Sequence, residues 1–154
     1  MMKMNKRKED TMFKLEFNEK NVKLNLEAEN WEDAIRKSAG VLVENGNVAP
    51  EYIDGIIAAI NEYGPYIVIS DGLAIPHTRP ENGAKNIGFS LTTFKKPVIF
   101  DENTSPVKVM IAFSAVDKDS HLEILKMIVS FVEEGKIEKI SDVESMEELL
   151  KVIN

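Results

Sequence analysis

The sequence of 154 residues contains no cysteine and only two histidines. The lack of cysteine excludes disulfide bonds, thiolate metal ligands and a cysteine nucleophile. No apolar run reaches the roughly 18 to 20 residues of a membrane-spanning helix, since the longest candidate, residues 107–116, is interrupted by Lys108 and Ser114. No Walker A loop, Gly-x-Gly-x-x-Gly loop or Gly-x-Ser-x-Gly elbow occurs. Nucleotide binding and serine hydrolysis therefore lack support, and any phosphate handled here must come already activated on a partner.

The composition is that of an ordinary soluble domain, with 44% hydrophobic and 29% charged residues. The net charge of −7 argues against a nucleic-acid partner, because binding to a phosphate backbone relies on clustered lysine and arginine. The first ten residues are polar and lack the apolar region of a secretory signal, so we expect a cytoplasmic location without membrane insertion. We predict a flexible tail over residues 1–12, where a small basic cluster is solvated, and a single folded domain over residues 13–154.

Apolar patterning predicts four strands separated by turns. The strands are expected at residues 22–26, with 13–17 as an extension or partner, at 86–94 and at 107–115, and within residues 66–72, which are expected to form a buried strand and a turn. Residues 95–97 and 101–106 are rich in turn-forming types. The segment 107–115 is apolar nearly throughout, which is typical of a strand covered on both faces.

Helical spacing of apolar residues predicts two helices before the first strong strand and three short or medium helices at the end of the chain. Asn30 is a candidate N-cap for the first helix, which Asn45-Gly46 ends, and Pro50 can start the second, which ends near Gly64. The later helices are expected from Ser120 to Gly135 and at 137–140 and 145–153. This order of elements predicts an α/β domain with helices packed on a sheet.

The first histidine, His77, follows the apolar run 66–72 at a point where the chain is stiffened by two prolines, Pro76 and Pro80. Proline fixes φ and disfavours helix at the residue before it, so the imidazole is held on extended backbone. Such a position would present a reactive side chain, although a histidine with a satisfied structural role at a strand end is equally compatible with the spacing.

The second histidine lies in Ser120-His121-Leu122-Glu123, which matches a capping box. The pattern predicts Ser120 as N-cap and His121 as the first helical residue, beside unpaired N–H groups that favour an anion. If strand 107–115 lies beside the strand that leads to His77, both histidines reach the same edge of the sheet. An ordinary residue at a helix start is the alternative for His121.

This pair suits phosphoryl transfer, which needs an in-line nucleophile and donors for the phosphoryl oxygens. His77 would be the nucleophile, and His121, the N–H groups after Ser120 and Arg79 would be the donors. A surface ion pair with Glu81 is the alternative for Arg79. A metal site could instead use both histidines with Asp117, Asp119 or Glu123, but the spacing is a weak match to metal-ligand patterns, so we predict no metal and no cofactor.

These residues resemble a known family. The chain is similar, over about residues 20–154, to the enzyme IIA component of the bacterial sugar phosphotransferase system, fructose-mannitol class. The similarity rests on four segments: Asp71-Gly72-Leu73-Ala74-Ile75-Pro76-His77, Asn86-Ile87-Gly88-Phe89-Ser90, residues 106–113 and Asp119-Ser120-His121-Leu122. The resemblance implies one three-layer α/β domain, of the EIIA type 2, with a mixed sheet and helices on both faces. It also implies that His77 is the phosphorylated residue and that His121 lies next to it.

The resemblance further implies a phosphocarrier in which phosphorylated HPr supplies the phosphoryl group and a IIB component receives it, serving a IIC transporter indirectly. A regulatory module controlled by phosphorylation of the same histidine is the alternative. Mannitol and fructose members have an arginine in the helix ahead of the histidine strand, and residues 59–64 here have none, so Arg79 is expected to substitute. The amino-acid sequence of residues 61–68 and 76–81 is more similar to the ascorbate and galactitol branch of the family.

Overall fold

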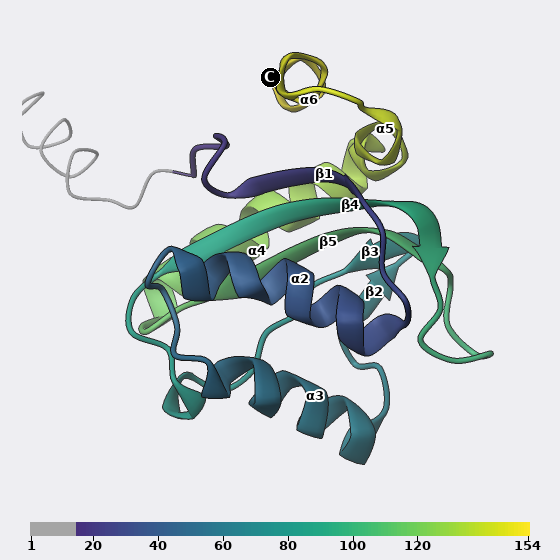
Figure 1. Ribbon diagram of the computed structural model, residues 1–154. Helices are drawn as coiled ribbons and strands as arrows, with labels where there is room; N and C mark the ends of the chain where they lie inside the picture. The colour runs from purple at the N-terminus through teal and green to yellow at the C-terminus, as the bar shows by residue number, and fades with distance from the viewer. Residues whose placement is uncertain (1–14) are drawn as a thin grey trace, which may run out of the picture.

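The computed structural model describes residues 15–154, and the predicted tail of residues 1–12 lies outside them. Five strands of the described chain form one sheet in the order β1-β4-β5-β3-β2 (Figure 1). β1 is parallel to β4 and β3 is parallel to β5, whereas β4 with β5 and β2 with β3 are antiparallel. The predicted mixed sheet is thereby confirmed. The strands are β1 (Val22–Leu26), β2 (Val68–Ser70), β3 (Gly72–Ala74), β4 (Gly88–Val98) and β5 (Val107–Ser114).

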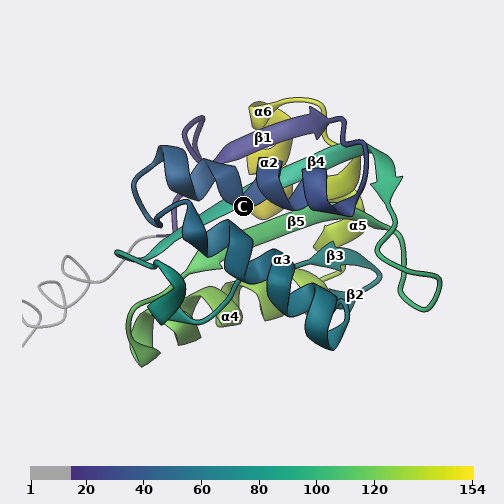
Figure 2. The same cartoon turned by 60° about the horizontal axis from the view of Figure 1, so that its bottom comes forward.

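Helices cover both faces of this sheet, as Figures 1 and 2 show from two directions. One face is covered by α2 (Trp31–Glu44) and α3 (Glu51–Tyr63), and the other by α4 (Lys118–Glu133), α5 (Lys136–Asp142) and α6 (Met146–Ile153). A short 3-10 turn, η1 (Pro80–Asn82), follows the first histidine. The three-layer α/β architecture predicted for the chain is therefore correct.

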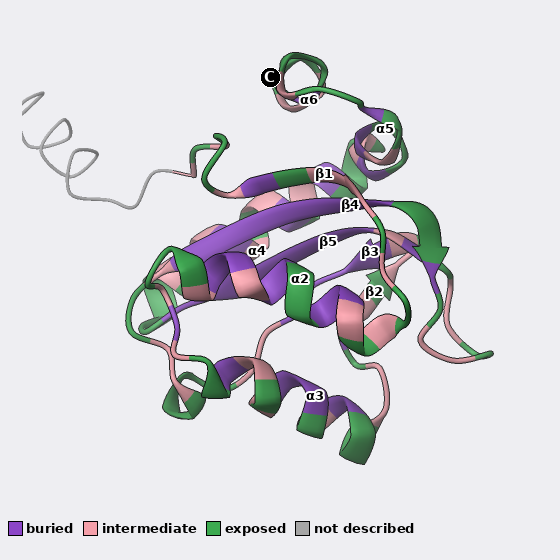
Figure 3. Ribbon diagram, viewed as in Figure 1, coloured by how far each residue is buried: buried purple, intermediate pink, exposed green. Residues whose placement is uncertain are grey.

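The central strand β5 joins the two halves of the core because its residues alternate between the two faces. Val107, Met110 and Ala112 pack with α2 and α3, while Ile111 and Phe113 pack with the helices of the opposite layer. Every residue of β5 except Lys108 is buried, and Figure 3 shows β4 and β5 as the buried centre of the molecule. The apolar run that predicted a strand covered on both faces is explained by this position.

Residues 66–72 contain the predicted strand and turn, but the strand is shorter and less buried than expected. β2 covers only Val68–Ser70, and the chain turns at Asp71 into β3 in a hairpin where Gly72 adopts a positive φ of 80°. β2 is the edge strand, so Ile69 remains 47% exposed, whereas Ile67 just before β2 and Leu73 and Ala74 on β3 are fully buried. The left-handed backbone at Gly72, which glycine adopts at little cost, allows this tight reversal.

Two further predictions about strands also differ from the structure. β4 continues through residues 95–97, which were expected to form a turn, and its pairing with β5 shifts register between Thr93 and Val98. Pro97 lies in this irregular stretch, where a missing ladder hydrogen bond is tolerated. Residues 15–17 form no strand, although Phe17 packs edge-on against Phe89 at 5.0 Å; the rest of the predicted segment 13–17 lies outside the described residues.

The first helix begins as predicted, with the Asn30 side chain accepting from the Asp33 N–H. The start of α4 is different: Asp117, and not Ser120, is its N-cap, and the helix begins at Lys118. The Asp117 carboxylate accepts the Ser120 N–H at 2.8 Å, so the capping group stands three residues before the predicted one. An aspartate and a serine are both good caps, and the aspartate is reached first as the chain leaves β5.

Candidate functional site

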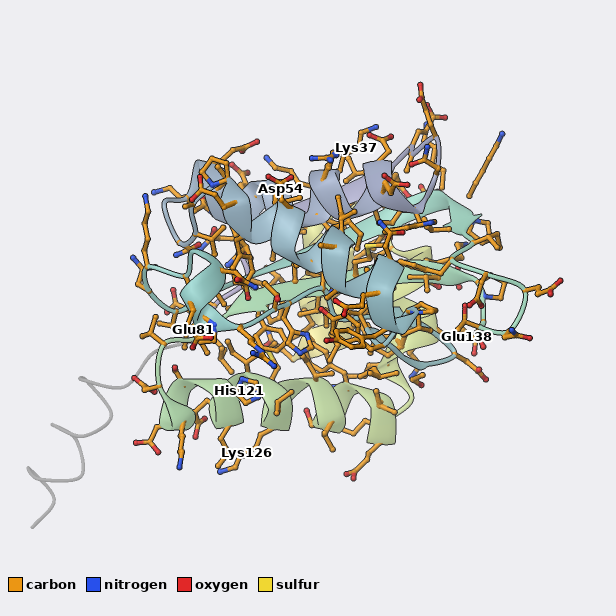
Figure 4. All side chains as sticks on the ribbon, turned by 90° about the horizontal axis from the view of Figure 1, so that it is seen from below. Lys37, Asp54, Glu81, His121, Lys126 and Glu138 are labelled. Carbon is orange, nitrogen blue, oxygen red and sulfur yellow. The ribbon has the colours of Figure 1, made fainter. Side chains whose placement is uncertain are left out.

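The two histidines meet at one edge of the sheet. β3 and β5 are neighbouring parallel strands, so their carboxyl ends lie at the same edge; β3 leads to His77 and β5 leads into α4, which carries His121. Figure 4 shows His121 on α4 below the sheet. The condition stated for the two histidines to meet, that strand 107–115 lies beside the strand leading to His77, is fulfilled.

Both histidines line a single pocket of about 440 Å³. Its walls come from α3, from the segment that follows His77, from the end of β5 and from α4. The lining residues are Tyr52, Ala59, Tyr63, Tyr66, His77, Thr78, Arg79, Pro80, Phe113, Ala115 and His121.

The His77 imidazole is held on three sides. It stacks on the Phe113 ring, with centroids 4.6 Å apart and planes 16° apart, and the Tyr66 ring meets it edge-on at 5.8 Å. Its Nδ1 lies 2.6 Å from the Ile75 carbonyl oxygen. A carbonyl only accepts hydrogen bonds, so Nδ1 carries the proton and Nε2 keeps its lone pair. The ring is therefore poised to react through Nε2.

Burial lowers the pKa of His77 below its ordinary value of 6.5. The hydrogen bond to Ile75 opposes this shift, and the nearby His121 adds to it. Removal from water disfavours a charged imidazole, which explains the direction. His77 is consequently neutral, and available as a nucleophile, at pH 7.

The His121 ring meets the Phe113 ring edge-on, with centroids 5.6 Å apart, so the same phenyl ring contacts both imidazoles. Its backbone N–H already donates to the Asp117 carbonyl at 3.2 Å. The His121 N–H is thus paired, because α4 begins three residues earlier than predicted and places His121 in its second turn. His121 reaches the pocket through its side chain, which is exposed.

Ser120 stands apart from the other predicted site residues. Its N–H donates to the Asp117 carboxylate, its hydroxyl donates to the Asp117 carbonyl at 3.3 Å, and it does not line the pocket. Arg79 does line the pocket. It is exposed, and it forms no ion pair within 4 Å with Glu81 or with any other residue between 15 and 154. The alternative of a surface pair with Glu81 is therefore wrong.

The sequence interpretation missed the aromatic walls of the pocket. All three tyrosines of the chain line it, together with Phe113. Tyr52 lies within the predicted second helix and Phe113 within the predicted strand 107–115, where each has the pattern of an ordinary core residue, and both are indeed buried. The signal in the sequence that could have indicated these walls is the small number of tyrosines. The chain has only three, and two of them flank residues 64–65, just before the hairpin that leads to His77.

Within residues 15–154, no three histidine or acidic side chains converge closely enough to hold a metal ion. None of the helices in this described part of the chain combines the length and the apolar character needed to cross a membrane.

Comparison with known proteins gives consistent results. The family model described as "Phosphoenolpyruvate-dependent sugar phosphotransferase system, EIIA 2" matches residues 16–154. The chain is 38% identical over 138 residues to the ascorbate-specific PTS system EIIA component of Shigella boydii, covering 88% of this chain and 90% of the relative.

Two solved structures are similar in fold. The mannitol-specific cryptic phosphotransferase enzyme IIA of Escherichia coli superposes with a TM-score of 0.80 at 33% identity, over 89% of this chain and 94% of the other. The mannitol enzyme IIA of Escherichia coli, solved in complex with phosphorylated enzyme IIB, gives a TM-score of 0.77 over 90% and 95% of the two chains. Its identity of 21% supports the fold alone.

Proposed function

This chain belongs to the EIIA 2 family of the phosphoenolpyruvate-dependent sugar phosphotransferase system, and we propose that His77 is its phosphoryl-carrying residue. The observation that carries the proposal is the contact between His77 Nδ1 and the Ile75 carbonyl oxygen, which leaves the lone pair on Nε2 of a neutral ring. The donor is phosphorylated HPr and the acceptor is a IIB component, and the exchange takes place in the cytoplasm.

The transfer is an in-line displacement at phosphorus. His77 Nε2 forms the new P–N bond with its lone pair, while the bond from phosphorus to the donor's leaving atom breaks and its electron pair stays with the donor. Positive charge then develops on the ring, and the proton stays on Nδ1, from which it is donated in a hydrogen bond to the Ile75 carbonyl oxygen that stabilises the charge. Passing the group to the acceptor reverses these changes.

Two side chains in the pocket are suited to bind the phosphoryl oxygens. The Arg79 guanidinium forms no ion pair with a carboxylate of residues 15–154, and the His121 side chain lines the same pocket as His77. Arginine matches the geometry of phosphate with paired N–H donors. Arg79 thus supplies the positive charge that the missing arginine of residues 59–64 would give. Ser120 contributes to phosphoryl binding only indirectly, because its N–H bond to the Asp117 carboxylate stabilises the first turn of α4, the helix that carries His121.

The surroundings of the pocket suit a protein partner. Val116 and Leu122 are about half exposed, at 49% and 50%, and line a second hollow of about 460 Å³ that shares Pro80, Ala115 and His121 with the histidine pocket. Exposed apolar side chains beside a reaction centre are typical of docking surfaces. A partner that covers them would also exclude water from the phosphoryl group.

We assign the chain to a transport system for ascorbate or a closely related compound, because the relative quoted above is ascorbate-specific and matches almost the whole domain. The sugar itself is phosphorylated elsewhere, and this chain needs to recognise only its protein partners. Specificity then lies in the surface around His77.

The test is incubation of the purified chain with labelled phosphoenolpyruvate, enzyme I and HPr. We expect an acid-labile phosphate on His77 Nε2, identified by NMR, and its transfer to an ascorbate-type IIB component. His77→Ala should abolish labelling, whereas the matched variant His121→Ala should still accept the group but transfer it more slowly. Labelling that survives in His77→Ala would overturn the assignment. A label that is accepted and never passed to a IIB component would favour the regulatory alternative.

A further inference from the structure

The peptide bond that follows His77 has both of its polar groups bound by tyrosine hydroxyls. The Tyr66 hydroxyl donates to the His77 carbonyl oxygen at 2.5 Å, and the Thr78 N–H donates to the Tyr52 hydroxyl oxygen at 3.2 Å. Tyr52 lies on α3 and Tyr66 lies in the segment between α3 and β2, so two separate parts of the chain hold one peptide unit.

The Tyr52 hydroxyl also connects this peptide to the strand beneath it. It donates its own hydrogen to the Phe113 carbonyl oxygen at 2.8 Å, and Phe113 is the residue whose ring stacks on the imidazole. Tyr52 is only 1% exposed, and burial raises its pKa to about 12, so the hydroxyl stays protonated at any physiological pH. A single buried oxygen therefore ties the segment after His77 to the end of β5.

The consequence for the imidazole follows from its few degrees of freedom. Its orientation is set by the backbone at His77 and by two side-chain torsions, and the backbone is fixed on both sides. Phe113 N–H donates to the Pro76 carbonyl at 3.1 Å before the histidine, and the two tyrosines hold the peptide after it. With the backbone fixed, the stacking on Phe113 and the bond from Nδ1 to Ile75 select one ring orientation.

We propose that Tyr52 and Tyr66 are positioning residues for phosphoryl transfer, which hold the His77–Thr78 peptide in place. The His77 Nδ1–H then keeps its hydrogen bond to the Ile75 carbonyl oxygen, and Nε2 alone accepts the phosphoryl group. This inference rests on the function proposed above. Tyr52 has the larger effect, because its hydroxyl is within hydrogen-bond distance of three backbone groups, the Thr78 N–H and the carbonyl oxygens of Thr78 and Phe113, whereas the Tyr66 hydroxyl contacts one and Tyr66 is 39% exposed. In Tyr66→Phe, water can replace the lost donor to the His77 carbonyl.

The experiment compares Tyr52→Phe and Tyr66→Phe with the wild-type chain, because each change removes only the hydroxyl and keeps the ring. We expect Tyr52→Phe to accept the phosphoryl group about 10- to 100-fold more slowly, as is usual for a misplaced reacting group. We also expect a fraction of the phosphate on Nδ1, seen by nitrogen NMR. Tyr66→Phe should show the same changes to a smaller degree.

The matched control is Ser90→Ala. Ser90 is fully buried on β4, outside the pocket, and its hydroxyl donates to the Ser38 carbonyl at 2.9 Å. This variant also loses one buried hydroxyl bonded to a backbone carbonyl, so it measures the cost of such a loss away from the histidine. We expect lower stability with unchanged labelling rate and labelling only on Nε2.

The outcomes separate the two proposals. A wild-type chain without label on His77 would overturn the function, whatever the tyrosine variants do. If the wild-type chain is labelled and Tyr52→Phe is labelled at the same rate and on the same nitrogen, the positioning role alone is overturned. The positioning role is also overturned if Ser90→Ala shows the slower and less selective labelling expected of Tyr52→Phe. Should circular dichroism show that Tyr52→Phe does not fold, the partly exposed Tyr66→Phe decides: a slower, less selective reaction supports the clamp and an unchanged one overturns it.

Discussion

The phenyl ring of Phe113 and the imidazole of His77 lie almost parallel, with their centroids 4.6 Å apart and their planes 16° apart. The stack covers one face of the imidazole with an apolar surface that is itself only 1% exposed. A cation in this position would lose hydration on that face, and the pKa of His77 falls accordingly. The ring stays neutral and keeps a lone pair for bond formation.

This shift predicts a pH dependence. Folding lowers the pKa of His77 below 6.5, so between the folded value and 6.5 the unfolded chain binds more protons than the folded one. The contribution of His77 to the free energy of unfolding is therefore complete above pH 6.5 and is lost as the pH falls through that window. NMR titration should give a His77 midpoint below 6.5. Urea unfolding should show a steeper loss of stability on acidification than in His77→Gln.

Removal of the neighbouring His121 imidazole provides the control for this prediction. His121 is one of the groups that lower the pKa of His77, so His121→Gln should raise the midpoint of His77 while leaving it below 6.5, because burial is the larger cause. A wild-type midpoint at or above 6.5 would contradict the assignment of a buried, neutral nucleophile.

Arg79 is expected to act on the transfer rate without affecting the fold. Charge-assisted hydrogen bonds contribute about 1.5 to 3 kcal/mol, so Arg79→Ala should slow phosphoryl acceptance by about 10- to 100-fold in a stopped labelling assay. Arg79→Lys should recover part of the rate, because it restores the charge but not the paired donors.

Arg36→Ala is the matched control for that substitution. Arg36 is also an exposed arginine, but it lies on α2 and faces Asp54 of α3 at 3.8 Å, outside the histidine pocket. Its loss should leave the labelling rate unchanged. Equal rates in Arg79→Ala and the wild type would show that the guanidinium does not reach the phosphoryl group.

The capping of α4 gives a prediction about stability. Asp117 accepts the Ser120 N–H, and this bond lowers the pKa of the Asp117 carboxyl. Asp117→Ala should therefore lower the urea midpoint clearly more than Ser120→Ala, which removes only a long bond from the serine hydroxyl to the Asp117 carbonyl. The Asp117 contribution should fade as the pH falls through the folded pKa of this carboxyl, below 3.8. A larger loss in Ser120→Ala would favour the capping box expected from the sequence.

The local patterns that are strong in this sequence predicted their elements well. Asn30 capped its helix as expected, and the apolar run of β5 became the central strand between two layers. Where two local signals competed, the prediction failed: Asp117 and Ser120 are both able to cap α4, and the choice depends on where the chain leaves β5. The register shift that accommodates Pro97 within β4 likewise depends on the neighbouring strand.

For the site, the sequence identified the two histidines and Arg79 but not the groups that hold them. The bonds of Tyr52 reach residues 26 and 61 positions away, and the stacking of Phe113 on His77 depends on the parallel pairing of β3 with β5. Such contacts leave no periodic trace in the sequence, because a buried tyrosine on a helix has the same pattern as any core residue. The tertiary structure was needed to connect them.

The hydrogen bonds around His77 also link its chemistry to the folding of the whole domain. The groups that hold His77 come from α3, from the segment before β2, from Ile75 after β3 and from the end of β5, so no fragment that contains only the histidine loop can reproduce the site. Contacts between residues far apart in the sequence form late in folding, because the long stretches of chain between them must first be brought together. A chain that has not completed its sheet would therefore remain unlabelled, and phosphate uptake would count native molecules in a mixture of folded and misfolded protein.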